Sequence, residues 1–303
     1  MTYALLHILL ALVAAPLPPA VINRTKAFFG GRNGPPLTQL YYDLFKLLRK
    51  GAVYSRTTSW VFRAGPPVEL AAALAALAVT PLGGVAALLA FPGDLLFLAY
   101  ALGLMRFFTV CAALDTGSPF EGMGASREVQ FSALAEVALL TGLVAVASQV
   151  HSFSLSVMSR EAWSATPGWE GGSTILLASA ALVVVLLAEN ARIPFDDPKT
   201  HLELTMIHEV MILDHCGVDL AMIEYASALK FWILGSLLAS LILPPWTASP
   251  GLNLAIGFCG LLLLAIAVGV IESIMARLKL VRAPQLLVAA GVLSFLAALV
   301  AKR

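Results

Sequence analysis

Carboxylates within apolar sequence are the residues of this chain best suited to chemistry. Glu136 lies in the apolar run 129–150 with no basic residue within one helical turn, and Glu272 lies near the end of the run 252–275. An ionisable side chain inside a membrane span is costly to bury and is by default a functional candidate. Burial disfavours the charged form of a carboxyl, which lets it exchange protons near neutral pH. These residues therefore predict proton transfer.

A second group of acids lies in the polar stretch 189–225, between the apolar runs 174–188 and 226–243. Glu189 and Arg192, three residues apart, can pair if a helix continues between them. A helix is also predicted from Asp197 to about Cys216. The proton-coupling candidates of this stretch are Glu189, Arg192, Asp196, Glu203, Glu209 and Asp214. Such a run of carboxylates can relay protons, whereas a merely solvated acidic face is the plainer interpretation.

Two further basic residues are predicted to partner these acids. Arg106 lies inside the apolar run 94–114, and Arg127 immediately precedes the run 129–150. Three histidines at positions 201, 208 and 215 recur every seven residues, which places successive members about 10 Å apart along a helix, too far to bind one metal ion. The sequence predicts no metal or cofactor site in this chain.

The composition is that of a membrane protein. Hydrophobic residues make up 59% of the chain and charged residues 12%, with a net charge of +1 and a mean hydropathy of +0.88. The small net charge gives no basic field for nucleic acid. The 3 cysteines form no C-x-x-C pair, so the usual ligands of zinc sites and iron–sulfur clusters are missing.

We predict an all-α polytopic membrane protein with about eight transmembrane helices and amphipathic surface helices in its loops. Each apolar run provides roughly the 20 residues that cross the hydrocarbon core. The runs are 3–22, 68–91, 94–114, 129–150, 174–188, 226–243, 252–275 and 284–300. They form one integral membrane domain, 1–303, with a loop at 23–67 that contains an amphipathic helix and an acidic loop at 189–225.

The distribution of basic residues predicts the orientation. Of the 19 Lys and Arg residues, 8 lie in the loop 23–67, and others follow span 252–275. Because basic loops stay in the cytoplasm, these loops and the acidic loop are predicted inside and both termini outside. The expected location is the cytoplasmic (inner) membrane.

The acidic loop also carries a resemblance. Residues 189–197, ENARIPFDD, resemble the E-N-x-R-x-P-F-D loop of the family that contains complex I subunit 1. The continuation, ELTMIHEVM at 203–211 and LDH at 213–215, is closer to the membrane subunits of energy-converting (group 4) hydrogenases, the formate hydrogenlyase and hydrogenase-4 type. The resemblance covers nearly the whole chain, and this loop is its most specific part.

The resemblance implies a membrane-anchoring and ion-coupling subunit of a redox-driven pump. Such a subunit docks a [NiFe]-hydrogenase-like module and links H2 evolution or uptake to proton or Na+ translocation. The implied partners are a hydrogenase large subunit, an iron–sulfur small subunit and antiporter-like membrane subunits. The nickel–iron centre and the iron–sulfur clusters are expected in those partners rather than in this chain.

Three alternatives remain open at this stage. A quinone-reducing complex I subunit would line a quinone cavity with the same loops, but the stretch after Pro194 lacks the glutamate-rich form of the quinone enzymes. A stand-alone secondary transporter would use Glu136 and Glu272 as coupling acids, but no internal repeat is visible. A purely structural anchor would need none of these acids.

Overall fold

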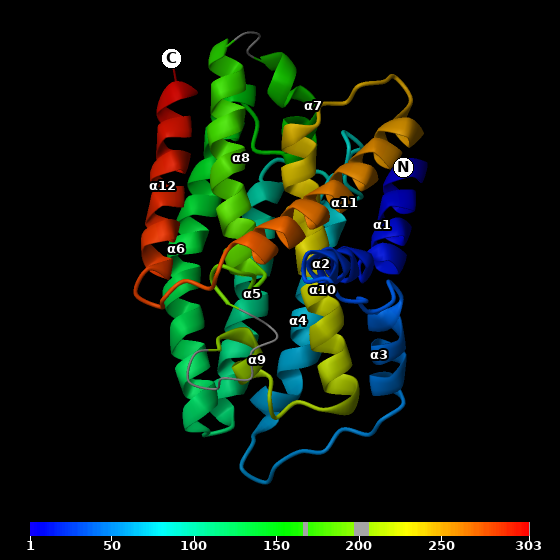
Figure 1. Ribbon diagram of the computed structural model, residues 1–303. Coiled ribbons are helices and arrows are strands. Elements are labelled where there is room, and N and C mark those ends of the chain that lie inside the picture. The colour runs from blue at the N-terminus through cyan, green and yellow to red at the C-terminus, as the bar shows by residue number, and fades with distance from the viewer. Residues whose placement is uncertain (166–168, 197–205, 303) are drawn as a thin grey trace.

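The computed structural model describes residues 1–165, 169–196 and 206–302. Within these ranges the regular structure is helical, with one isolated bridge between Leu82 and Val85, so the predicted all-α polytopic class is confirmed (Figure 1). The helices are α1 (Thr2–Ala14), α2 (Leu17–Phe29), α3 (Gln39–Leu48), α4 (Trp60–Val79), α5 (Asp94–Asp115), α6 (Pro119–Val150), α7 (Leu155–Ala165), α8 (Trp169–Glu189), α9 (His208–Met211), α10 (Gly217–Ile242), α11 (Pro250–Ile274) and α12 (Ala283–Val300).

Among the described residues, 7 helices are long and apolar enough to cross a membrane: α4, α5, α6, α8, α10, α11 and α12. The first predicted span is instead a bent pair, α1 and α2, with an angle of 47° between them. The break falls at Ala15–Pro16, because Pro16 and the prolines that follow withhold the N–H groups that would continue α1. Counting this pair as one span gives the predicted total of eight.

The second span begins earlier and ends earlier than predicted. α4 starts at Trp60, after the N-cap Ser59, and contains Pro66 and Pro67, whereas the sequence pattern placed the start after these prolines. Prolines are tolerated in membrane helices because neighbouring groups satisfy the freed carbonyls. The loop 23–67 is correspondingly shorter, and its predicted amphipathic helix is α3.

Residues 80–93 are irregular chain rather than the continuation of a span. Irregular backbone at membrane depth is stable only where protein covers it. Here the Gly83 N–H donates to Ser240 Oγ of α10 (3.1 Å) and the Ala87 N–H donates to Ser156 Oγ of α7 (3.0 Å). Hydroxyls from two helices thus replace the hydrogen bonds that a helix would have made.

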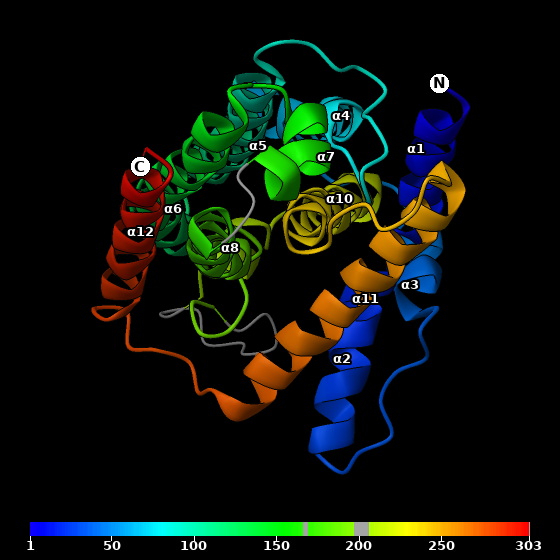
Figure 2. The same ribbon diagram turned by 90° about the horizontal axis from the view of Figure 1, so that it is seen from above.

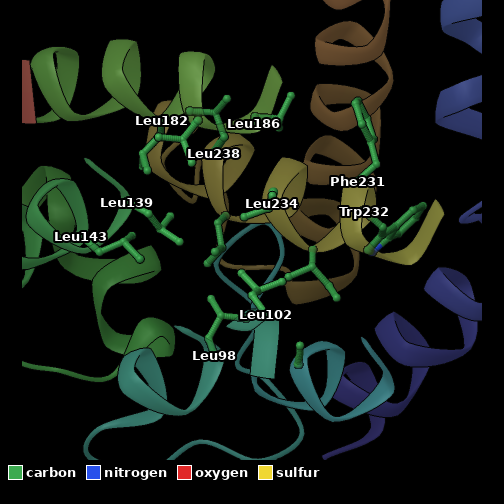
Figure 3. Packing of buried hydrophobic residues seen from close by; sticks show 14 of the residues in the cluster. Leu98, Leu102, Leu139, Leu143, Leu182, Leu186, Phe231, Trp232, Leu234 and Leu238 are labelled. Atoms are coloured by element: carbon green, nitrogen blue, oxygen red, sulfur yellow. The ribbon is translucent and has the colours of Figure 1, made fainter. Parts of the chain in front are cut away.

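α10 is the central element of the bundle. Of its most apolar stretch 78% is buried, against 28–56% for the other spans. Viewed along the spans, it lies among α4, α7, α8 and α11 (Figure 2). Leucines of α5, α6, α8 and α10 point toward one another and fill the middle of the bundle (Figure 3). We call this the leucine layer: Leu98, Leu102, Leu139, Leu143, Leu182, Leu186, Leu234 and Leu238.

The end of the molecule that carries α3, α9 and the α5–α6 connection, at the bottom of Figure 1, is called the loop side. There α9 packs against α6, and Gly124 permits the close approach because any Cβ at that position would clash with the Val210 side chain. A continuous helix up to Cys216 was predicted here. Within the described part of this stretch only His208–Met211 is helical. Asp197 lies outside the described residues.

Candidate proton-transfer site

Arg106 is the centre of a buried charge cluster. From α5 it donates to the carboxylate of Glu189 at the end of α8, and its Nη1 lies 3.3 Å from Glu136 Oε2 on α6. Its Nε is 3.9 Å from Glu128 Oε1. The arginine side chain is only 11% exposed. One cation therefore links carboxylates from two other spans, and the predicted role of Arg106 as a partner of buried acids is what the geometry presents.

Lys230 from α10 supplies the second cation. Its Nζ is 2.8 Å from Glu189 Oε2, so that Glu189, 2% exposed at its side chain, is held between Lys230 and Arg106. On α4, buried Glu69 accepts a hydrogen bond from Thr109 of α5 (3.0 Å). A buried ion pair is stable only when such partners replace the lost water. The named acids of this cluster are Glu69, Glu128, Glu136 and Glu189, and its bases are Arg106 and Lys230.

Glu136 differs from the prediction in its exposure. The side chain is 41% exposed, because α6 turns it toward the outer surface of the bundle beside Arg106 rather than into the core. The sequence argument had made it a buried carboxyl without a basic neighbour. The neighbour was missed because it comes from α5, thirty residues away in the chain.

Two connected cavities join this cluster to the loop side. A cavity of about 240 Å³ lies among α2, α3, α10 and the acidic loop. A smaller one, about 30 Å³, is walled by the charge cluster itself. The two share Asn190, Ala191, His208 and Ser227. The larger cavity carries five charged side chains, namely Asp43, Arg192, Asp196, Glu209 and Glu224. Polar groups thus run from the loop side to the centre of the bundle.

A separate ion-pair group fixes the bent pair α1–α2. Glu272 on α11 is buried and lies 2.7 Å from Lys26 Nζ of α2 and 3.6 Å from Arg192 Nη1. The predicted pairing of Glu189 with Arg192 is therefore wrong. The chain leaves the helix after Glu189, where Ala191 adopts a φ of 48°, and Arg192 then points to α11.

Asp196 is held in place as a fixed anion. Its Oδ1 lies 2.9 Å from Arg277 Nη2, and its Oδ2 accepts hydrogen bonds from the N–H groups of Ile207 (2.9 Å) and His208 (3.2 Å). The carboxylate is 1% exposed. Charge-assisted bonds to a buried carboxylate are among the stronger ones in proteins. Asp196 thus joins the acidic loop to α9 and to the connection between α11 and α12.

Neutralising Asp196 is expected to loosen this part of the loop side. Asp196→Asn should cost about 2 kcal/mol of stability, because the Arg277 pair and the charge-assisted bonds are weakened together. Amide hydrogen exchange at residues 206–211 and 275–282 should accelerate. The matched control is Asp214→Asn, an exposed acid of the same loop. Equal exchange in the two variants would remove the positioning role of Asp196.

Two neighbouring residues of α9 titrate abnormally. Burial raises the pKa of Glu209 to about 7, and the charges of Glu224 and Asp196 add to this while Arg192 opposes it. Burial, together with the charge of Lys230, lowers the pKa of His208 to about 4. At neutral pH His208 is therefore uncharged, and Glu209 is close to half protonated. A carboxyl with this property can pick up and release protons under working conditions.

The Glu209 carboxyl makes stability depend on pH. Its pKa in the folded chain lies above the ordinary 4.5, so the folded state binds the proton more tightly than the unfolded one. The stability gained is complete below about pH 4.5 and is lost as the pH rises through about 7. Glu209→Gln is therefore expected to raise Tm at about pH 8 and to change it little at about pH 5. An unchanged pH profile of Tm, or the same change in Asp214→Asn, would contradict this assignment.

The remaining predicted residues have different positions. Arg127 donates to the Met206 carbonyl (3.0 Å) and so holds the acidic loop against α6. Asp214 is exposed at the loop side, and Glu203 lies outside the described residues. Lys230 was missed, although a single lysine inside the apolar run 226–243 was a sufficient signal. Lys26 and Arg277 entered the sequence argument only as markers of orientation.

Relatives of known name share this arrangement of helices. Hydrogenase-4 component C of Escherichia coli K12 is 32% identical over 80% of this chain and 75% of its own length. Formate hydrogenlyase subunit 4 of the same organism is 30% identical over 97% of this chain and 96% of its own. The NADH dehydrogenase family matches residues 1–302. The chain belongs to this family. It is of the complex I subunit 1 type, and the resemblance found in the acidic loop is confirmed.

More distant relatives belong to other respiratory complexes. A membrane subunit of the NADH-quinone oxidoreductase of Syntrophotalea carbinolica is 27% identical over 67% of this chain and 63% of that protein. A solved structure of the membrane-bound sulfane sulfur reductase, an archaeal respiratory membrane complex, contains a chain of the same fold, with a TM-score of 0.84. That chain is 23% identical, with 99% of this chain and 98% of that one covered. Chains similar to this one are thus found in several membrane complexes.

Proposed function

We propose that this chain is the membrane-anchoring and ion-coupling subunit of a multisubunit redox-driven pump. It docks a [NiFe]-hydrogenase-like module and links H2 evolution or uptake to translocation of protons or Na+. The partners are a hydrogenase large subunit, an iron–sulfur small subunit and antiporter-like membrane subunits, and the nickel–iron centre and iron–sulfur clusters belong to those partners. The likeness to hydrogenase-4 component C and formate hydrogenlyase subunit 4 supports this choice.

The observation that carries the coupling role is the run of titratable groups from the loop side to Glu136. It begins at Glu209 in the larger cavity, passes the shared residues of the two cavities and reaches Glu189 between its two cations. Arg106 then joins Glu189 to Glu136. The leucine layer lies next to this run in the bundle (Figure 3). A change of charge at the loop side would shift the proton affinities of the carboxylates along the run.

Docking at the loop side is supported by the same geometry. Asp196 and Arg127 hold the acidic loop at defined contacts, and Asp214 is exposed there for a partner. Redox chemistry in the docked module would act on this loop first. The basic loop residues support a cytoplasmic location of the loop side, with the protein in the inner membrane and both termini outside.

A quinone-reducing complex I subunit is the second candidate, and the relatives from NADH-quinone oxidoreductases favour it. Its substrate would occupy the cavity of about 240 Å³. Ligand cavities for neutral ring systems are mostly apolar. This cavity instead has the five charged side chains described above, which suits protons and water better than a quinone ring. The charge of the lining therefore favours the hydrogenase type.

The proposal is tested by purifying the tagged chain from detergent-solubilised membranes, identifying its partners by mass spectrometry and assaying H2 evolution with reduced viologen. Recovery of a large soluble partner that carries C-x-x-C pairs, together with H2 evolution, is the expected result. Quinone-reductase partners without H2 evolution would move the assignment to the second candidate. A chain recovered alone and monodisperse would leave a stand-alone transporter as the better explanation.

A further inference from the structure

The outward face of α3 is a stripe of aromatic and basic side chains that no described element covers. Tyr42 is 65% exposed and Phe45 is 59% exposed. Lys46 and Arg49 are exposed beside them, and the Arg49 guanidinium lies over the Phe45 ring, 4.8 Å from its centroid. The helix packs against α10 and α2, and it lies at the edge of the molecule (Figure 2). The stripe therefore faces whatever surrounds the protein.

The depth of this stripe follows from α1. α3 begins where α1 ends, because the Tyr41 hydroxyl donates to the Val13 carbonyl, and it continues toward the loop side (Figure 1). A 13-residue helix rises about 20 Å, so α1 crosses about two thirds of a hydrocarbon core of about 30 Å. The first turns of α3 then lie in the remaining hydrocarbon and its boundary. Its last turn lies among the headgroups.

The order of residues along α3 fits that gradient. Tyr42 and Phe45 come first, at the boundary where membrane proteins concentrate aromatic side chains. Lys46, Arg49 and Lys50 follow at headgroup depth, where long basic side chains reach the phosphates.

The surroundings of α3 are also positive. The only acid between residues 24 and 63 is Asp43, which lines the larger cavity. The exposed cations of this segment are Arg24, Arg32, Lys46, Arg49, Lys50, Arg56 and Arg63. A positive surface around an aromatic stripe is complementary to anionic lipid.

We propose that the outward face of α3 binds the headgroups of anionic phospholipids in the leaflet on the loop side. Lys46 and Arg49 contact the lipid phosphate, and Tyr42 and Phe45 lie along the upper acyl chain. The depth of the aromatic residues favours lipid over a peripheral protein, because a water-soluble subunit does not reach the hydrocarbon boundary. This site goes beyond the proposed function and does not rest on it.

The test uses the full chain, purified and delipidated in detergent, and mixed micelles that contain either phosphatidylglycerol or phosphatidylcholine. Bound lipid is measured by mass spectrometry of the intact protein. Each basic residue beside an anionic surface strengthens binding about fivefold, so Lys46→Gln/Arg49→Gln is expected to weaken phosphatidylglycerol binding about twentyfold. The loss should shrink at high salt because the interaction is screened. Phosphatidylcholine binding should not change.

The matched control is Lys279→Gln/Arg282→Gln, which removes the same charge from another exposed loop-side segment. It is expected to bind phosphatidylglycerol like the unaltered chain, as is the charge-preserving variant Lys46→Arg/Arg49→Lys. Equal loss in the control, or equal binding of the two lipids, would overturn the proposal. In the assembled complex, a lysine cross-link from Lys46 to a peripheral subunit would also overturn it and would assign this face to protein docking.

Discussion

Arg106→Met is expected to be the most damaging single substitution in the charge cluster. With Arg106 present, the four named acids of the cluster face two cations; without it, Lys230 is the cation that remains among the described residues of the cluster, and its ion pair is with Glu189. Removing one partner of a buried ion pair costs about 3–5 kcal/mol, because the remaining charge is left without compensation. The Tm of the purified chain should fall strongly, and coupled activity of the assembled complex should be lost.

The comparison that gives this prediction its force is Lys230→Met. Within the described part of the chain Lys230 has a single ion-pair partner, so its removal should cost less than removal of Arg106. Arg160→Met, an exposed arginine on α7, should change neither Tm nor activity. If Arg106→Met unfolded at the same temperature as Arg160→Met, the cluster would not be a stabilising centre of the bundle.

Glu136→Gln is expected to separate stability from coupling. The carboxylate is 41% exposed and is one of several partners of Arg106, so its neutralisation should cost less than about 1 kcal/mol. Glutamine keeps the size of the side chain but cannot carry a proton. Ion translocation by the assembled complex in proteoliposomes should therefore fall on the order of tenfold or more, with H2 evolution and Tm measured in parallel.

Glu161→Gln is the appropriate comparison, because Glu161 is an exposed acid on α7 that lies outside the run of titratable groups. It should leave translocation unchanged, and Glu136→Asp should restore part of it. Full translocation in Glu136→Gln would end the coupling role of this residue and would leave the chain as a structural anchor of its complex.

Much of the fold follows from local sequence. Uninterrupted apolar runs specify α5, α6, α8, α10, α11 and α12, because hydrocarbon requires internally hydrogen-bonded helices. The boundaries at prolines were less predictable. Pro16 does break the first run, whereas Pro66 and Pro67 lie within α4. Whether a proline ends a membrane helix depends on neighbouring groups that the local sequence does not specify.

The candidate site was predictable in its residue types but not in its pairings. Glu136, Glu189, Arg106 and Glu272 were identifiable as charges in apolar surroundings. Their partners come from other helices: Glu189 pairs with Lys230, and Glu272 pairs with Lys26 and Arg192. Sequence spacing suggested a local pair instead, because it carries no information about which helices become neighbours.

The sequence by itself determined that this chain is a polytopic membrane protein with ionisable groups in its spans, because hydrophobic length and the cost of burying charge are local properties. It also determined the family, through the loop at 189–197. Only the tertiary structure decided that Arg106 joins carboxylates of separate spans and that Glu136 is half-exposed. The same holds for Asp196, which is a fixed anion through its contacts. Those outcomes depend on which helix faces meet, and packing of the whole bundle sets them.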